Sequence, residues 1–518
     1  MIDATPLLSV YARRRTAQLS TVDPVAEQVV QLMQLVRRGR QTRFGYEHGF
    51  TRIRSPADFQ RCVPLRKYED FWRDYWQPTF PRCHDVSWPG TIPYYALTSG
   101  TTTGNTKYVP ITRAMLRANR RAVLDVFTFH LAARPSSRVL GGQCFMLGGS
   151  TDLTRLAPGI YSGDLSGIAA NEVPWWVRPR FFPPPRLALI ADWNHKIEIL
   201  ACESLRRDIR AISGTPSWVL PFLKKLADLQ LARAGKTQTV YPNLELFIHG
   251  GVNYAPYRAQ FDALLLPSVD QREVYPASEG FIAVADRSYG EGLRLIIDNG
   301  LFFEFVPVEE IYAAEPKRHW LGTVEIGVNY AVALSSNAGL WAYLLGDTVR
   351  FIDLDPPRLL ITGRLSYTLS AFGEHLIGEE LDAAVLAAAD EIGAHVVEYT
   401  VAPVFPKAPT DRGGHDFIVE FATNVTDDAL TRFREALDAD LSIRNADYAA
   451  HRAGMRAPRL VAAAPGSFAA WMQCRGRAGG QNKVPRVIND PDLLAELLLF
   501  LRKAPSCPDL ARPPRGTS

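Results

Sequence analysis

The sequence predicts an α/β protein in two parts, a large N-terminal domain of mixed β-sheets and helices and a smaller C-terminal α+β domain. Strand-like and helix-like runs alternate through the first two thirds of the chain, which is typical of a layered α/β fold. Beyond Arg364 the pattern restarts with a new set of helices and strands. Between the parts, in the segment 370–374, Gly373 gives the backbone the freedom of a hinge. We therefore expect a large domain at 1–370 and a small mobile domain at 374–503.

Individual helices and strands follow from capping residues and apolar periodicity. Asp23 and Pro24 form a cap and first-turn pair, so a helix is expected to begin there. Asp490 and Pro491 predict a terminal helix in the same way. The other expected strands are 187–190, 244–248, 322–326, 396–404 and 417–421, and the expected helices of the small domain are 378–392 and 430–441. The proline-rich residues 504–518 predict a disordered tail.

The composition favours a globular enzyme that works on small molecules. With 518 residues, 47% of them hydrophobic, the chain can bury a large core. The net charge of +4 gives no electrostatic footprint for nucleic acid, and the run 13–15 of three arginines is interpreted as a solvated helix end. No apolar segment approaches the ~20 residues that span a membrane. The six cysteines are scattered, which favours free thiols. We expect a cytoplasmic monomer or weak homodimer without nucleic-acid or membrane partners.

The most informative segment is a hydroxyl- and glycine-rich loop that ends in a lysine. It reads Thr-Ser-Gly-Thr-Thr-Thr-Gly-Asn-Thr-Lys over residues 98–107, directly after an apolar strand-like run. Glycines let backbone N–H groups approach phosphate oxygens, hydroxyls add donors, and Lys107 supplies a compensating charge. The order of residues differs from the P-loop of nucleoside triphosphatases. The segment predicts a nucleotide-phosphate loop, and the alternative is a solvated linker.

Later segments carry the partners that such a loop needs. Glu279 lies in a Tyr-Pro-Ala-Ser-Glu-Gly stretch at the end of an expected strand, where its carboxylate could hold Mg²⁺ bound to phosphates. Asp347 leaves another apolar strand and could accept hydrogen bonds from ribose hydroxyls. Arg364 follows a glycine, and Lys483 lies in the polar loop Gln-Asn-Lys-Val-Pro-Arg. The alternative for Arg364 and Lys483 is a solvated surface charge, and for Asp347 an ordinary turn residue.

The order of these motifs resembles that of the adenylate-forming (acyl-activating) enzyme superfamily. The chain is most similar to a bacterial-type member of the Gretchen Hagen branch, the acyl acid–amido synthetases known from plant auxin and jasmonate conjugation. The resemblance extends over nearly the whole chain. Further segments that carry it are 42–45, 59–60, 63–65, 214–218, 445–448 and 481–486. It implies that the large domain is the adenylate-forming, ATP- and acyl-binding one.

The resemblance also implies a role for each motif. The phosphates would be bound by Ser99, Gly100, Thr101, Thr102 and Thr103, the adenine by Tyr275, Ala277 and Ser278, Mg²⁺ by Glu279, and the ribose by Asp347, with Arg364 at the ribose or the hinge. Lys483 would offset charge on the α-phosphate during adenylation, and Lys107 either competes for that role or only orders the loop. The acyl pocket would include Trp218, Gly250, Val252 and Tyr254.

The implied activity is ATP- and Mg²⁺-dependent amide synthesis between a small carboxylic acid and an amino acid or other amine. One alternative is an adenylate-forming ligase with a thiol acceptor such as coenzyme A. Another is a catalytically silent binding protein of the same fold.

Other constellations are weaker. His375 and Glu379 lack further ligands for a metal, and the chain has no G-x-S-x-G or H-E-x-x-H motif. Trp175 and Trp176 are interpreted as packing residues.

Overall fold

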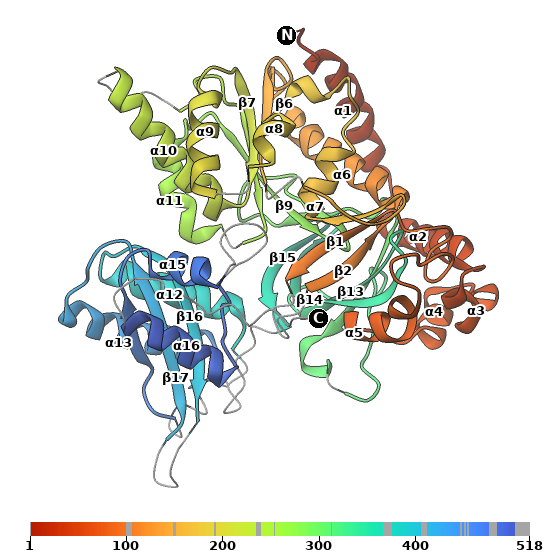
Figure 1. The fold of residues 1–518 in the computed structure, drawn as a ribbon. Helices are drawn as coiled ribbons and strands as arrows, with labels where there is room; N and C mark the ends of the chain where they lie inside the picture. The colour runs from red at the N-terminus through yellow and green to blue at the C-terminus, as the bar shows by residue number, and fades with distance from the viewer. Residues whose placement is uncertain are drawn as a thin grey trace, which may run out of the picture. The chain divides into compact units, whose positions relative to one another are not determined.

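The structure is a computed structural model, and it describes most of the chain. The described residues are 2–99, 106–148, 152–190, 193–234, 240–252, 254–311, 313–365, 376–405, 412–445, 448–449, 452, 455–475 and 484–502. The chain divides into two compact units, Met1–Leu365 and Ser366–Ser518, which agrees with a large and a small part (Figure 1). The expected hinge with Gly373 and the expected tail 504–518 lie outside the described residues. No helix in the described part is long and apolar enough to cross a membrane.

The helices of the large unit begin where capping residues predict. The carboxylate of Asp23 accepts hydrogen bonds from the backbone N–H groups of Val25 and Ala26, so α2 begins at the expected cap. The helices are α1 (Thr5–Leu19), α2 (Pro24–Gly39), α3 (Arg43–Glu47), α4 (Pro56–Cys62), α5 (Tyr68–Phe71), α6 (Arg113–Ala133), α7 (Leu165–Asn171), α8 (Pro185–Ala188), α9 (Trp193–Ser204), α10 (Pro216–Ala234) and α11 (Ala255–Leu264).

An 11-stranded sheet runs through the large unit. In spatial order its strands are β12 (Leu301–Pro307), β13 (Asn329–Ser336), β14 (Leu340–Leu354), β15 (Pro357–Arg364), β11 (Leu293–Leu295), β10 (Gly280–Val284), β9 (Asp270–Ala277), β8 (Leu246–Gly250), β7 (Ile209–Gly214), β3 (Gln143–Leu147) and β6 (Phe181–Phe182). Strands β6, β3, β7, β8 and β9 are parallel, and from β9 to β12 all neighbours are antiparallel. The carboxyl ends of β7, β8 and β9 therefore lie side by side.

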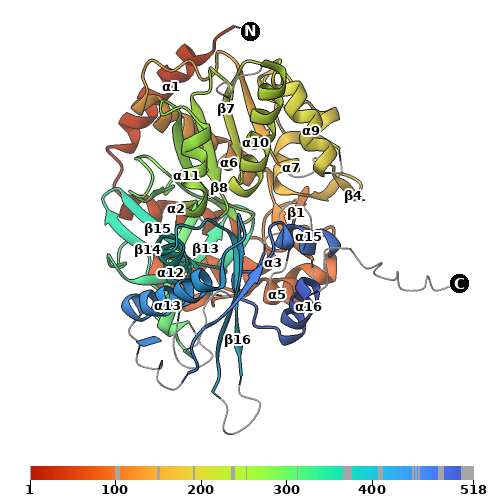
Figure 2. The ribbon, with the colours of Figure 1, turned by 90° about the vertical axis from the view of Figure 1, so that its left-hand side faces the viewer.

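Helices cover both faces of the parallel part of this sheet (Figures 1 and 2). On one face α9, α10 and α11 pack with Phe247 in one apolar cluster. On the other face α1 and α6 pack with Leu246 in another. Successive residues of β8 thus point to opposite faces, as the pleat requires.

A second sheet of four strands carries the hydroxyl-rich loop. Its order is β2 (Thr106–Ile111), β1 (Tyr94–Ser99), β5 (Ile160–Gly163) and β4 (Thr154–Ala157). Strands β1 and β2 are antiparallel and pair from Tyr94 with Ile111 to Ser99 with Thr106. Residues 100–105, between these strands, lie outside the described residues.

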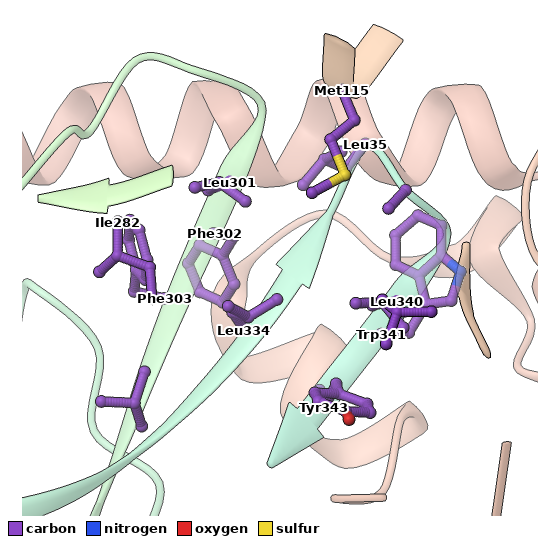
Figure 3. Packing of buried hydrophobic residues seen from close by; sticks show 14 of the residues in the cluster. Leu35, Met115, Ile282, Leu301, Phe302, Phe303, Leu334, Leu340, Trp341 and Tyr343 are labelled. Carbon is purple, nitrogen blue, oxygen red and sulfur yellow. The ribbon is translucent and has the colours of Figure 1, made fainter. Parts of the chain in front are cut away.

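The largest apolar cluster joins the first helices to the antiparallel strands. Figure 3 shows Leu35 of α2 and Met115 of α6 pointing onto strands that carry Phe302 and Trp341. Trp341 is fully buried, and its indole N–H donates a hydrogen bond to the carbonyl of Ser87 at 2.9 Å. Close packing here holds β14 against the N-terminal helices.

The small unit is an α+β sandwich of its own. A three-stranded sheet of β16 (Val396–Val404), β17 (Gly414–Phe421) and β18 (Arg459–Ala463) forms its centre. Helices α12 (Gly378–Glu391) and α13 (Asp427–Arg444) pack on one face, and α15 (Ser467–Cys474) and α16 (Pro491–Arg502) pack on the other. The strand expected at 396–404 and the helices expected at 378–392 and after Asp490 are confirmed.

Several expectations are wrong. Residues 187–190 begin inside α8 rather than in a strand, because Pro184 and Pro185 start a helical turn there. Residues 322–326 form turns, since the backbone N–H groups of Thr323 and Val324 both donate to the carbonyl of Trp320. The side chains of two expected packing residues are exposed, Trp175 by 80% and Trp176 by 68%. Cys62, Cys83, Cys144 and Cys202 are free, but Cys474 is disulfide-bonded.

Arg15 is not a solvated helix end. It is 4% exposed, and its guanidinium binds the carboxylates of Asp125 and Asp298 at 2.8 and 2.7 Å. Asp125 lies on α6 and Asp298 precedes β12, so this arginine fastens α1 to two other elements. Arg14, its neighbour on α1, is exposed.

Replacing Arg15 by methionine should lower the free energy of unfolding by about 3–5 kcal/mol, because two carboxylates stay buried without their shared cation. Arg14→Met on the same helix is the control and should change it by less than about 0.5 kcal/mol. Denaturant unfolding followed by circular dichroism measures both. Equal stability of the two variants would contradict a structural role for the buried ion pair.

Candidate active site

The expected acyl and adenine segments meet at one edge of the large sheet. Gly214 at the end of β7 pairs with His249 of β8, and Gly250 pairs with Val274 of β9. In open α/β sheets, ligands bind beyond the carboxyl ends of the parallel strands. A ligand-binding site is therefore expected at this edge of the sheet.

Asp347 is the centre of a buried polar cluster. Its side chain is nearly buried, with the residue 7% exposed. One carboxylate oxygen accepts a hydrogen bond from the hydroxyl of Tyr275 at 2.6 Å, and the other binds the Nε of Arg364 at 2.6 Å. Tyr275 comes from β9 and Arg364 from the end of β15, so three strands meet at this carboxylate.

The strand pairing explains this geometry. Asp347 lies inside the long strand β14, directly opposite Arg364 of β15, and not at a strand end as its motif suggested. The register between β14 and β15 shifts after Thr348, because β15 has an extra residue, Thr362. The Thr362 hydroxyl donates to that of Thr348 at 2.8 Å and fixes the bulge. Bulges re-aim neighbouring side chains and often lie beside functional sites.

The Asp347 carboxylate fits a ribose diol. An ionised carboxylate offers about four acceptor positions, and two of them are used by Tyr275 and Arg364. The remaining two can accept from two neighbouring hydroxyl groups. The guanidinium of Arg364 balances the charge of this carboxylate.

Glu279 lies in the tight turn between β9 and β10. Gly280 follows it because a Cβ there would come within 2.7 Å of Leu301. The Glu279 carboxyl bonds to the hydroxyl of Tyr343 and lies near both Asp347 and Arg364. Burial raises the pKa of Glu279 above its usual value, and the Asp347 charge adds to this. A divalent cation bound here would favour the ionised form, so the carboxyl fits a Mg²⁺ ligand.

Lys107 is already paired in this structure. It lies on β2 opposite Thr98, and its ammonium group is 2.9 Å from the carboxylate of Glu69 and 5.0 Å from the ring centre of Tyr68. Although burial opposes it, Lys107 lowers the pKa of Glu69. These contacts suit a lysine that fastens the hairpin base to α5. Ser99 ends β1, and Gly100, Thr101, Thr102 and Thr103 lie outside the described residues.

Lys483 lies outside the described residues, but its neighbours on the C-terminal side are placed. Arg486 binds Glu398 at 2.7 Å and Asp382 at 3.1 Å, and its guanidinium lies over the ring of Tyr399 at 4.1 Å. Its carbonyl also accepts the backbone N–H of Val401 at 3.0 Å. The segment after Lys483 is thus anchored to β16 of the small unit.

The four expected acyl-wall residues lie around the ends of β7 and β8. Trp218 is in the first turn of α10, and Val252 lies in the bend after β8. Gly250 is required by packing, since a Cβ there would come within 2.1 Å of the Val274 carbonyl. Tyr254 is buried before α11, and its hydroxyl donates to Gln271 at 2.6 Å.

Sequence reasoning missed Tyr343, the partner of Glu279. Tyr343 opens the stretch Tyr-Leu-Leu-Gly-Asp that ends at Asp347, but its residue type and position alone indicated no role. Its position depends on the preceding Ala342, whose φ of 47° is left-handed, and on Arg66, whose backbone bonds to both neighbours of Tyr343. Neither contact can be inferred from residue order. The donor set is small, since no group of three or more His, Cys, Asp or Glu side chains suited to a metal occurs among the described residues.

Comparison with solved structures supports the fold. The chain superposes on a GH3.15 acyl acid amido synthetase with a TM-score of 0.77 and 17% identity, covering 97% of this chain and 96% of that one. It superposes on a 2-hydroxyisobutyryl-CoA ligase in the postadenylation state, in complex with 2-HIB-AMP, with a TM-score of 0.60 and 17% identity. That match covers 92% of this chain and 91% of the ligase. The expected fold class is confirmed.

Two curated relatives of the chain come from rice. A probable indole-3-acetic acid-amido synthetase GH3.9 of Oryza sativa subsp. japonica is 26% identical over 313 residues, 55% of this chain and 69% of that protein. An indole-3-acetic acid-amido synthetase GH3.8 of Oryza sativa subsp. indica is 29% identical over 308 residues, 54% of this chain and 49% of that protein.

Family models match three stretches of the chain in order. The N-terminal domain of the GH3 family matches residues 13–144, the central domain matches 294–364, and the C-terminal domain matches 379–492. The central match contains both Asp347 and Arg364, and the three matches together cover more than half of the chain. This protein belongs to the GH3 family.

Proposed function

We propose that the protein is an ATP-dependent acyl acid–amido synthetase, which activates a small carboxylic acid as acyl-AMP and transfers the acyl group to an amino acid or other amine. The observation that carries the proposal is the polar cluster that Tyr275, Arg364 and Glu279 form around the buried Asp347, beside the ends of the parallel strands. Family membership and the names of the rice relatives support it.

The chemistry explains why a nucleotide is needed. A carboxylate does not react with amines at neutral pH, because oxide would have to leave. In the first step a carboxylate oxygen attacks the α-phosphorus of ATP, and the bond to the β-phosphate oxygen breaks with loss of pyrophosphate. In the second step the amine nitrogen attacks the acyl carbon, AMP leaves with the electron pair of the broken C–O bond, and the ammonium proton is released.

The nucleotide would lie across the large unit. Asp347 accepts hydrogen bonds from the ribose hydroxyls while Arg364 balances its charge, and the segment Tyr275, Ala277 and Ser278 borders the adenine. The phosphates meet the loop after β1, which supplies Ser99, Gly100, Thr101, Thr102 and Thr103. Preorganised donors of this kind stabilise charge that develops on phosphate oxygens.

Magnesium would be held by Glu279 together with phosphate oxygens. The ion supplies positive charge that offsets the charge on the departing pyrophosphate. The contact with Tyr343 orients the Glu279 carboxyl, and the nearby Arg364 offsets part of the repulsion between Glu279 and Asp347.

Lys483 would supply the cation at the α-phosphate. Lys107 is the weaker candidate, because Glu69 already balances its charge. Adenylation needs a cation at the α-phosphate, whereas aminolysis needs that space for the amine. We therefore propose that the small unit, which carries Lys483, turns about the hinge at 370–374 between the steps.

We place the enzyme in the cytoplasm as a monomer or weak homodimer. The substrates ATP and the amine are metabolites of that compartment.

A thiol acceptor such as coenzyme A is the second candidate, because the fold is shared with a 2-hydroxyisobutyryl-CoA ligase. Acid-dependent pyrophosphate release with ATP should be screened over a panel of acids, first without acceptor and then with amino acids or coenzyme A. Product masses separate amide from thioester. Absence of acid-dependent pyrophosphate release with every acid would overturn the proposal, and absence of any release would favour a catalytically silent binding protein.

Asp347→Asn should weaken ATP binding about 10- to 100-fold, because a neutral amide replaces a carboxylate whose charge-assisted hydrogen bonds contribute about 1.5–3 kcal/mol each. Calorimetric titration with ATP measures the dissociation constant. Asp353→Asn is the control, since this residue lies on the same strand and pairs with Arg358 outside the cluster. Equal ATP affinity of the two variants would refute the ribose assignment.

Lys483→Ala should slow acyl-adenylate formation about 100- to 1,000-fold, with a smaller effect on amide formation from preformed acyl-AMP. Lys107→Ala should slow it by no more than about tenfold, because Glu69 already pairs with that charge. Single-turnover pyrophosphate release measures the first step. A larger loss in Lys107→Ala than in Lys483→Ala would reverse the assignment of the adenylation cation.

A further inference from the structure

Two adjacent tryptophan side chains lie open on the surface of the large unit. Trp175 is 80% exposed and Trp176 is 68% exposed. Within the described part of the chain, neither indole packs on another aromatic ring or donates a hydrogen bond. A single exposed apolar side chain is ordinary, but two neighbouring aromatic ones form a surface of the kind that another molecule covers. The pair therefore calls for a partner.

The turn that carries the pair is held in one conformation. It joins α7 to β6, and the backbone N–H groups of Val177 and Arg178 both donate to the carbonyl of Pro174, at 2.9 and 3.2 Å. The Arg178 guanidinium donates to the carbonyls of Asn171 and Val173, at 3.2 and 3.1 Å. A rigid aromatic pair loses little conformational freedom when it binds. This is typical of the residues that contribute most to an interface.

The end of the turn is fastened to other parts of the large unit. The guanidinium of Arg180 donates to the carbonyls of Ile2 and Leu140, at 2.7 and 2.5 Å. The side-chain amide of Gln143 donates to the carbonyl of Pro179 at 2.8 Å. Ile2 is 87% exposed, so it adds apolar surface beside the turn.

The charges around the pair permit two copies to meet. Residues 173–177 include no charged side chain. On the N-terminal side, the carboxylate of Glu172 is balanced by Arg120 at 3.2 Å, and the same guanidinium donates to the Glu172 carbonyl at 2.6 Å. Two identical surfaces of this kind can therefore approach without repulsion between like charges at their centre. A neutral aromatic surface is complementary to a second neutral aromatic surface, which another copy of the chain provides.

The exposed area favours a weak dimer. A tryptophan side chain can bury about 150–250 Å², so the exposed parts of the two indoles offer about 300 Å² per copy. A standard interface buries about 800 Å² per partner and has an apolar centre with a polar rim. The tryptophans and Ile2 fit such a centre, and Glu172 and Arg178 fit the rim. An interface at the low end of the size range should have a dissociation constant of about 1–100 μM.

The neighbouring sheet edge favours contact through side chains. Strand β6 is the last strand at one edge of the 11-stranded sheet and has two residues. Pro183, which follows it, has no N–H group to donate to an added strand. A second copy is therefore expected to pack on the turn before β6 and not to extend the sheet.

We propose that the turn at 171–180 is a self-association surface, where the Trp175–Trp176 pairs of two copies of the chain pack against each other in a twofold-symmetric dimer. In such a dimer the same patch of each copy faces the other. The inference goes beyond the proposed function and does not depend on it, because no residue of the turn belongs to the candidate active site.

Sedimentation velocity of the full chain over a range of concentrations measures the association. The wild-type protein should change from monomer to dimer with a dissociation constant of about 1–100 μM. The double variant Trp175→Ser, Trp176→Ser should weaken the dimer about 30-fold or more, because central aromatic residues contribute most of the binding energy. Ile326→Ser is the control, since this exposed residue pairs with Phe351 of β14, near the opposite end of the sheet. It should leave the dissociation constant unchanged.

Trp176→Glu is a second variant, which would bring two like charges together at the twofold contact and should also prevent dimerisation. Circular dichroism melting checks that each variant stays folded, as substitution of an exposed side chain predicts. A wild-type protein that is still monomeric at about 500 μM would overturn the inference, as would a dimer that persists in both variants.

A vesicle assay tests the other possible occupant of the surface. Wild-type protein is mixed with vesicles of phosphatidylcholine and phosphatidylserine, and co-sedimentation measures binding. The inference predicts no binding that depends on the two tryptophans. Binding that is lost in the double variant, together with a wild-type chain that does not self-associate, would identify a membrane-binding surface and refute the dimer.

Discussion

The buried carboxylate of Asp347 is the interaction on which the site depends. Burial of an unpaired charge is costly, so the fold must bring a cation and a donor to it. Arg364 and Tyr275 do this at 2.6 Å each, and they come from two other strands. The same contact therefore aligns β9, β14 and β15, and these two partners leave two acceptor positions of the carboxylate for the ribose that we propose. A change in the β14–β15 register by one residue would turn Asp347 to the other face of the sheet.

The described cations of the candidate site are each paired with a carboxylate. Lys107 is balanced by Glu69, and Arg364 is balanced by Asp347, within the large unit. In our proposal the large unit holds the nucleotide, and both of these cations are already partnered there. In our proposal the additional cation comes from Lys483 in the small unit. One site can then have a cation at the α-phosphate during adenylation and leave that space to the amine during aminolysis. The anchoring of Arg486 to Glu398 and Asp382 gives the segment after that lysine a fixed base.

The apolar pattern of the sequence predicted helices and strands correctly where burial of apolar side chains decided the local structure. Residues 396–404 and 378–391 form the expected strand and helix because they have a continuous apolar pattern and form one core of their own. The short runs 187–190 and 322–326 do not form strands. In the first, two prolines begin a helical turn, and in the second, backbone hydrogen bonds to Trp320 close a turn. A run of four or five residues does not outweigh such local hydrogen bonding without a neighbouring strand to pair with.

The sequence by itself determined which chemical groups the protein has and in what order, and motif order was enough to predict the family and the fold class. Tertiary structure alone decided which of them meet. Asp347 lies within a strand because the pairing with β15 continues past it, and Tyr343 reaches Glu279 because Arg66 and a left-handed Ala342 hold that turn of the backbone. Arg15 is buried, and the ring nitrogens of His249 have no hydrogen-bond partner within the described part of the chain, because residues far apart in sequence surround both side chains. Burial and pairing are properties of long-range contacts, and residue order does not encode them in any local pattern.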